Sequence, residues 1–505
     1  MAISPELDRQ ERAGKYFLVA LGVYFLIQVA IRVAQQGALE LDEAEQVFIA
    51  QHLRLGYNTQ PPLYAWLQWL AFQVFGVSHL GLAVLKNALL FLLYASLFQT
   101  ARLLLGTLPG IAVAASLVLL IPFGWEAQVD RTHTILATAL AAATLWAYFA
   151  LLRHPTRRLR LVLGLLIGLG MQSKYNFAIF VLALCGASFI VREHRVVVWT
   201  KDMWLTVQVA VLTLLPHAMW FFQQAGTAST TTLQKMGGAP GSGYARNVIN
   251  GLFEFFVSVV AFLAPFWLVL GVLFWRRRQA SAQPGLDARF FLWFYATGAA
   301  CITALVLSGY LANIRSRWLQ PLLFSLPLAF CLFFPPRLAK HYRQLLFVSV
   351  LGASVLTVAL ALRPQIQVAL GKDARIYQPY PELAAEIAHR FPAARAVAAQ
   401  DLHVAGNIRF QLDHVAAVLT EDMCAALPGL EGKLLVLVQS ESEAAGRGLG
   451  KACPYTVVVE EGQIDAYSLN YPRQQLSFDY ALVRRERRQT WATANQAPED
   501  RSNDL

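Results

Sequence analysis

Hydrophobic and polar positions alternate along most of the chain on the scale of membrane-spanning helices. Apolar runs recur between residues 16 and 362, and short polar stretches separate them. Because a helix needs about 20 apolar residues to cross the hydrocarbon core of a bilayer, the pattern predicts about eleven transmembrane helices. The expected segments are 16–36, 80–100, 108–123, 133–152, 160–173, 175–191, 203–222, 250–275, 290–310, 317–334 and 344–362.

The pattern changes after residue 362. Residues 380–391 are amphipathic at helical spacing, and the later runs "AVAAQ", "HVAAVL", "KLLVLVQ" and "YTVVVEE" have the short β-rich character of strands. We therefore expect a transmembrane domain over 1–362 and a small α/β domain over 363–485. The tail 486–505 is polar enough to predict disorder.

Composition agrees with a membrane protein. Of the 505 residues, 56% are hydrophobic and only 14% are charged, whereas about a quarter of a soluble protein is charged. The net charge of +11 comes mostly from alternate loops, including 153–160 and 337–343, so it indicates topology rather than nucleic-acid binding. By the positive-inside rule the N-terminus is cytoplasmic. The sequence thus predicts a multi-pass membrane protein whose C-terminal domain and acidic first loop lie outside the cytoplasm.

The first exterior loop, 37–79, carries an unusual cluster of acids. Asp42, Glu43 and Glu45 follow the first apolar segment, and the spacing of the apolar residues after them predicts a short interfacial helix. On such a helix Asp42 and Glu45 share a face, while Glu43 points elsewhere. Helix capping accounts for one acid near an N-terminus. Three acids beside the membrane favour a functional site.

A second amphipathic helix is predicted to start within "TQPPLYAWLQW" (59–69), with proline in its first turn. Its aromatic residues Tyr64, Trp66 and Trp69 suit a belt at the membrane interface. They equally suit a groove for a lipid or a sugar, together with Tyr57 and Gln60. The interfacial belt and the groove are compatible interpretations, and both can be true of the same residues.

Four cations are expected on the same face as the acids: Lys86, Lys174, Arg315 and Arg317. Any one of them alone is best explained by snorkelling to lipid headgroups. Lysine point charges and arginine forks are also the groups that recognise phosphate. Four of them near carboxylates predict a site that binds a phosphate-bearing substrate. Asp130 either adds a carboxylate to this site or pairs with its neighbour Arg131.

Other chemistry is not supported by the sequence. The four histidines expected near the outer face have no close metal-ligand spacing, so a bound divalent metal is left open. The chain has no phosphate-binding P-loop and no nucleophile elbow. Any energy for a reaction must therefore arrive with a membrane-borne substrate.

In the C-terminal domain, Cys424 and Cys453 form either a disulfide in an oxidising compartment or two free thiols.

The motifs resemble those of a known family. The stretches "DEAEQ" (42–46), "QPPLYAW" (60–66), "LAVLKNALL" (82–90), "GLGMQSKYNF" (168–177) and "RSRWLQPLL" (315–323) follow the order seen in the GT-C glycosyltransferases. The likeness covers about residues 15–340. It is strongest to the family 39/83 group, which includes protein O-mannosyltransferases and bacterial lipid A aminoarabinose transferases.

The resemblance implies an enzyme that moves a sugar from a polyprenyl-phosphate donor to an acceptor outside the membrane, with inversion at the anomeric carbon. Asp42 would be the catalytic carboxylate, and Glu43 and Glu45 would lie with it in the substrate site. Lys86 occupies the position of a family arginine and Lys174 that of a family lysine. Either Arg315 or Arg317 would be the basic residue before the tenth span. The resemblance also implies that the membrane is the bacterial inner membrane and that the C-terminal domain is periplasmic.

Substrate identity is less constrained by the resemblance. Gln60 stands where the aminoarabinose transferases have Glu-Lys before Pro-Pro, so neither their sugar nor a metal site carries over. We expect lipid A or the lipopolysaccharide core as the acceptor, and a protein acceptor is the alternative within the class. A polyprenyl-lipid flippase is the alternative from another class. Transporters usually place polar groups at the membrane midplane within inverted repeats, which this sequence does not show.

Overall fold

The computed structural model describes residues 5–57, 60–223, 243–274, 285–309, 311–334, 339–426, 433–439, 456–468, 471 and 474–485. Contacts within the chain divide it into two units. Unit 1 consists of Met1–Gln36 and Glu40–Ile376, and unit 2 of Gly37–Leu39 and Tyr377–Leu505. Residues 363–376, which composition assigns to the second domain, therefore group with unit 1.

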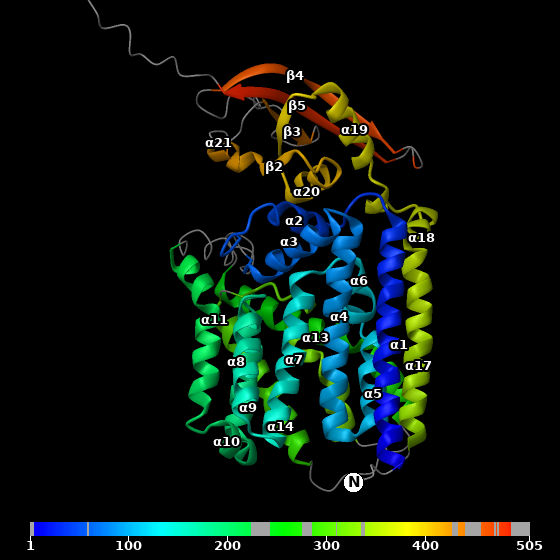
Figure 1. Ribbon diagram of the computed structural model, residues 1–505, viewed down its shortest axis with the longest axis vertical. Coiled ribbons are helices and arrows are strands. Elements are labelled where there is room, and N and C mark those ends of the chain that lie inside the picture. Colours follow the sequence, from blue (N-terminus) through cyan, green and yellow to red (C-terminus); the bar gives the residue numbers. More distant parts are fainter. Residues whose placement is uncertain are drawn as a thin grey trace, which may run out of the picture. The chain divides into compact units, whose positions relative to one another are not determined.

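Unit 1 is helical throughout its described part (Figure 1). Its α-helices are α1 (Pro5–Gln35), α2 (Leu41–Ile49), α3 (Leu63–Phe75), α4 (His79–Leu105), α5 (Thr107–Ala115), α6 (Ala127–Val129), α7 (His133–Arg153), α8 (Arg157–Met171), α9 (Phe177–Ile190), α10 (Arg192–Val198), α11 (Met203–Gln223), α13 (Tyr244–Phe274), α14 (Leu286–Leu307), α15 (Ser316–Leu323), α16 (Leu326–Phe333), α17 (Ala339–Ala361) and α18 (Arg363–Ala369). The 3-10 helix η1 (Ser116–Leu119) and the π-helix η2 (Pro122–Glu126) follow α5.

By length and composition, seven helices in the described residues could cross a membrane. The number rises to ten if each of three bent helix pairs is one span. One of these pairs, Phe177–Ile190 and Arg192–Val198, bends by 108°. Helix α8, expected as a span over 160–173, has only 15 residues. The structure therefore confirms a polytopic helical fold, while eleven spans remains a prediction.

The loop over residues 37–79 folds as the sequence predicted, into the two short helices α2 and α3. Prolines 61 and 62 precede α3 rather than lying within it, since Pro62 is the N-cap and Leu63 is the first helical residue. In Figure 1, α2 and α3 lie at one end of the helical bundle. The N-terminus of the chain and α10 lie at the opposite end.

Close helix packing explains the glycines of α8. Gly164 and Gly168 are four residues apart and face α11, which allows the two backbones to approach as small residues do in membranes. A Cβ at Gly164 would lie 2.4 Å from the carbonyl oxygen of Thr206. The hydroxyl of Thr206 in turn donates a hydrogen bond of 3.0 Å to the backbone oxygen of Arg160.

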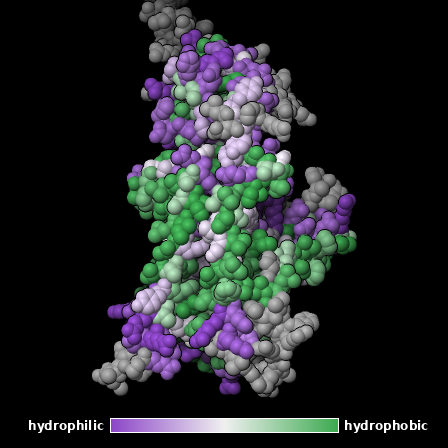
Figure 2. All heavy atoms as spheres, turned by 90° about the vertical axis from the view of Figure 1, so that its right-hand side faces the viewer, coloured by the Kyte–Doolittle hydropathy of each residue, from purple (hydrophilic) through white to green (hydrophobic). Residues whose placement is uncertain are grey.

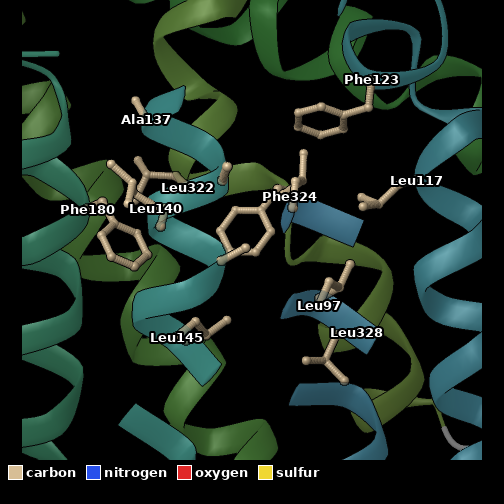
Figure 3. Packing of buried hydrophobic residues seen from close by; sticks show 14 of the residues in the cluster. Leu97, Leu117, Phe123, Ala137, Leu140, Leu145, Phe180, Leu322, Phe324 and Leu328 are labelled. Atoms are coloured by element: carbon tan, nitrogen blue, oxygen red, sulfur yellow. The ribbon is translucent and has the colours of Figure 1, made fainter. Parts of the chain in front are cut away.

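A single large apolar cluster holds the bundle together. Figure 3 shows Leu140 of α7, Phe180 of α9 and Leu322 of α15 pointing toward one another. Leu97 of α4 and Leu328 of α16 lie near each other in the same view and belong to the same cluster. In Figure 2, hydrophobic side chains also cover the visible flank of the bundle, as expected for a lipid-facing surface.

Unit 2 contains a five-stranded sheet in the order β2-β1-β3-β5-β4. Its strands are β1 (Ala394–Ala399), β2 (Ala416–Leu419), β3 (Lys433–Gln439), β4 (Thr456–Tyr467) and β5 (Gln475–Arg485). Strand β1 pairs in parallel with β2 and β3, whereas β5 pairs antiparallel with β3 and β4.

The helices of unit 2 are α19 (Tyr380–Arg390), α20 (Leu402–Gln411) and α21 (Met423–Ala426), with a short 3-10 turn at η5 (Thr420–Asp422). The 3-10 turn η4 (Arg375–Tyr377) spans the boundary between the two units. The small α/β composition expected near the C-terminus is thus confirmed. Cys424 is in a disulfide. Its predicted partner Cys453 and the tail 486–505 lie outside the described residues.

Candidate active site

The acids of α2 point in two directions, as helical spacing requires. Glu43 is 1% exposed and accepts from Arg32 of α1 at 2.6 Å and from Lys86 of α4 at 3.3 Å. Burial disfavours its charged form, but the two cations outweigh burial and hold the pKa of Glu43 far below its usual value. Glu43 and Lys86 therefore lock α2 against α1 and α4, and neither side chain is open to solvent.

A second set of contacts fixes the start of α2. Glu40, its N-cap residue, binds Arg363 of α18 at 2.5 Å and Arg375 at 3.6 Å. The backbone N–H of Glu40 donates to Oε2 of Glu43 at 3.3 Å. These contacts hold the first turn of α2, and with it the backbone of Asp42, in place.

Asp42 meets Asp130 across the site. The backbone N–H of Asp42 donates a hydrogen bond of 2.7 Å to Oδ1 of Asp130, and the Thr132 hydroxyl lies 3.5 Å from Oδ2 of Asp42. Burial and the negative charge of Asp42 raise the pKa of Asp130 to about 6. Arg131 pairs with Glu126 at 3.1 Å. The alternative that Asp130 only pairs with Arg131 is therefore wrong.

The face of α2 that points away from Glu43 carries Asp42 and Glu45. The charges of Asp42 and Glu45 both act on Lys174 and on Arg317. Lys174, in the turn between α8 and α9, donates to the hydroxyl of Thr134 at 2.5 Å. Burial and the positive charge of Arg317 lower the pKa of Lys174 to about 7. The charges of two carboxylates and two cations from distant segments therefore influence one another.

Further buried polar groups lie near these charges, and Gln46 among them was not singled out from the sequence. Nε2 of Gln46 lies 3.1 Å from Nε2 of His133, whose ring centroid is 5.2 Å from that of Tyr64. Oε1 of Gln46, Nδ1 of His133 and Nε of Arg317 are buried without a hydrogen-bond partner in the described part of the chain. Such atoms normally bind water or ligand. The signal for Gln46 was its position one turn after Asp42 on the same helix.

The other expected residues have local contacts or exposure of their own. The hydroxyl of Tyr57 donates to the backbone oxygen of His52 at 2.6 Å, and its backbone pairs with Gln60. Tyr64 is buried. Arg315 is exposed at the N-cap of α15. Within the described segments, no three His, Cys, Asp or Glu side chains gather into a metal-binding group.

Comparisons with known proteins identify the family of this chain. The family model described as dolichyl-phosphate-mannose-protein mannosyltransferase matches residues 59–220. The lipopolysaccharide core galacturonosyltransferase RgtB of Rhizobium johnstonii is 32% identical over 438 residues, which cover 85% of this chain and 88% of RgtB. RgtA of the same organism, also a lipopolysaccharide core galacturonosyltransferase, is 31% identical over 458 residues, covering 87% of this chain and 89% of RgtA.

The fold has a solved counterpart. The crystal structure of ArnT from Cupriavidus metallidurans, bound to undecaprenyl phosphate, matches with a TM-score of 0.62 at 13% identity and covers 92% of this chain and 98% of ArnT. The fold is therefore that of ArnT, and the family model and the relatives define a GT-C membrane glycosyltransferase. Within that class the chain belongs to the family that contains RgtA and RgtB. The resemblance drawn from the motifs is confirmed.

Proposed function

We propose that this enzyme transfers galacturonic acid from a polyprenyl-phosphate donor to a sugar of the lipopolysaccharide core. The names of RgtA and RgtB support galacturonic acid as the sugar and the lipopolysaccharide core as the acceptor. The undecaprenyl phosphate bound to ArnT supports a polyprenyl-phosphate donor. The observation that carries the proposal is that the negative charges of Asp42 and Glu45 act on the cations Lys174 and Arg317.

Transfer to a core sugar requires two kinds of group. The attacking hydroxyl must lose a proton as its oxygen bonds to the anomeric carbon, and a carboxylate at hydrogen-bond distance serves as the general base. We assign this role to Asp42. Attack from the side opposite the phosphate breaks the bond between the anomeric carbon and the phosphate oxygen and inverts the configuration.

The departing lipid phosphate gains negative charge as that bond breaks. Positive groups that are already in place stabilise this charge without reorganisation. We assign Lys174 and Arg317 to this task, with exposed Arg315 at the entrance for the lipid. Lys86 was expected to bind the phosphate directly. Its pairing with buried Glu43 supports a role in holding α2 in place.

We further propose that the site faces the periplasm of a bacterial inner membrane. The excess of Lys and Arg in the loops at the other end of the helices supports this orientation. The end of unit 1 that carries α2 and α3 would then lie at the level of the outer headgroups (Figure 1). Lipid-borne donors and acceptors meet at that level.

Mass spectrometry of lipid A and core from cells with and without the gene tests the proposal. Deletion should remove the mass of a hexuronic acid from the core, and the wild type should restore it. Asp42→Asn should not restore it, although the variant accumulates as folded protein. The matched control Asp8→Asn, on an exposed residue that pairs with Arg12, should restore it fully. An unchanged core with an altered lipid A would overturn the proposal that the core is the acceptor. Full rescue by Asp42→Asn would overturn the assignment of Asp42 as the general base.

A further inference from the structure

A surface pocket of about 540 Å³ lies in unit 1 beside α10. In Figure 1, α10 lies at the end of the helices opposite α2 and α3. It forms where α8 begins and where α10 leads into α11. Arg160 of α8, Val196 and Val197 of α10, and Thr200, Lys201 and Asp202 of the following turn line most of it. None of these residues belongs to the site around Asp42.

Arg160 is a buried cation without a buried counter-ion. Its side chain is 3% exposed, and its guanidinium donates to the backbone oxygens of Val198 at 3.3 Å and Val197 at 3.2 Å and to the hydroxyl of Thr200 at 3.0 Å. All three acceptors are neutral. In the described part of the chain Arg160 makes no ion pair. A buried charge in this state is costly, and an anion in the pocket would offset the cost.

The mouth of the pocket adds a second cation. Lys201 is exposed, and within the described residues it forms no ion pair with Asp202 or any other acid. The fork of Arg160 and the point charge of Lys201 together form a donor set suited to phosphate. Asp202 is the single acid in the lining, so the pocket keeps a net positive charge.

The surroundings of the pocket indicate where such a phosphate comes from. Val196 in the lining is 64% exposed, and Trp199 and Trp204 near it in the chain are 43% and 65% exposed. Tryptophan is enriched where a membrane protein meets the headgroup layer. Exposed apolar side chains beside a cationic pocket suit a molecule that has both a phosphate and acyl chains.

We propose that this pocket binds the phosphate headgroup of an anionic membrane lipid between Arg160 and Lys201, with the acyl chains along Val196. Basic pockets between helices on one side of a membrane are known to hold such headgroups. The bound lipid would fix the turn between α10 and α11 and hence the packing of α11 on α8. The pocket is independent of the sugar substrate and of the reaction.

Native mass spectrometry of the purified full-length protein in detergent tests this site. The probes are dioleoylphosphatidylglycerol and, as a lipid without net charge, dioleoylphosphatidylcholine. Arg160 is tied into the backbone, so its substitution risks misfolding, and Lys201→Gln is the informative variant. The matched control is Arg343→Gln, because Arg343 is an exposed cation on α17 and does not line the pocket.

We expect the wild type and Arg343→Gln to bind phosphatidylglycerol equally and in preference to phosphatidylcholine. Lys201→Gln should bind it about tenfold more weakly, as expected when one charge-assisted hydrogen bond is lost. Equal affinity for the two lipids, or an equal loss in Arg343→Gln, would overturn the proposal. Displacement of phosphatidylglycerol by inorganic phosphate at matched ionic strength would overturn the lipid assignment in favour of a free phosphate.

Discussion

The backbone N–H of Asp42 donates a hydrogen bond of 2.7 Å to the carboxylate of Asp130, which joins two acids 88 positions apart in the chain. The bond keeps Asp130 beside the proposed catalytic carboxylate. Two negative charges in one partly buried site disfavour each other, so the second carboxylate takes up a proton more readily than usual. Asp130 thereby makes the charge of the site dependent on pH near neutrality.

The first prediction concerns stability and pH. The pKa of Asp130 is raised to about 6 in the folded protein. Its ionisation therefore opposes folding above pH 6, and this penalty disappears as the pH falls through 6 toward 4. Asp130→Asn keeps the hydrogen-bond acceptor and removes the charge. Thermal unfolding at pH 7.5 should show the variant to be more stable by about 1–2 kcal/mol, with the difference lost at pH 4.5. A variant that is less stable at pH 7.5 would contradict this.

The second prediction concerns Lys174 and the pH profile of transfer. Because the pKa of Lys174 is lowered to about 7, the side chain carries its charge below pH 7 and loses it above. The proposed stabilisation of the leaving phosphate then fades as the pH rises. In an assay with a polyprenyl-phosphate donor, kcat/KM should fall on the alkaline side with an apparent pKa near 7.

Lys174→Arg separates this titration from the position of the cation. Arginine stays charged across the whole range, so the alkaline fall in kcat/KM should move to higher pH or vanish, even if the maximum rate drops. Lys174→Met should lower kcat/KM at every pH by about 100-fold. This is the size of effect seen when an enzyme loses one donor that stabilises charge in the transition state. An unchanged alkaline limb in Lys174→Arg would remove Lys174 from this role.

The third prediction tests the buried ion pairs of Glu43. Glu43→Gln leaves Arg32 and Lys86 buried without a counter-charge, and breaking such a pair costs about 3–5 kcal/mol. Because the pKa of Glu43 is held far below its usual value, this contribution to the stability of the wild type is fully present above the ordinary glutamate pKa and is lost progressively as the pH falls below it toward the folded-state pKa. The variant should show a large fall in Tm. Glu193→Gln breaks the exposed pair with Arg289 and should hardly change Tm. Similar shifts in the two variants would refute the locking role of Glu43.

The fourth prediction tests the contact between α8 and α11. In Gly164→Ala the new Cβ would lie 2.4 Å from the backbone oxygen of Thr206, so the helices must separate. We expect a lower yield of folded protein and a lower Tm on size-exclusion and thermal analysis. Gly285→Ala is the control, because nothing lies within 4 Å of its added Cβ. Equal behaviour of the two variants would show that α8 and α11 do not need their close approach.

The local arrangement of the site followed from the sequence. A helix begun at Leu41 necessarily places Asp42 and Glu45 on one face and turns Glu43 away, because side-chain direction repeats every 3.6 residues. The structure has Glu43 facing Arg32 and Lys86, while the charges of Asp42 and Glu45 reach Lys174 and Arg317. The apolar spacing likewise predicted the membrane helices, since bilayer thickness fixes their length.

The partners of these charges were decided only by tertiary structure. Lys86 and Lys174 look alike in sequence, as lone lysines beside apolar segments, yet Lys86 is paired with a buried glutamate and Lys174 faces the site. Asp130 has Arg131 as its neighbour in sequence, but its carboxylate accepts a hydrogen bond from the backbone N–H of Asp42. Which side chains meet depends on how α1, α2, α4 and α7 pack, and packing combines segments far apart in the chain. The sequence by itself therefore determined the helices and the residue types of the site, and the fold assigned each charge its partner.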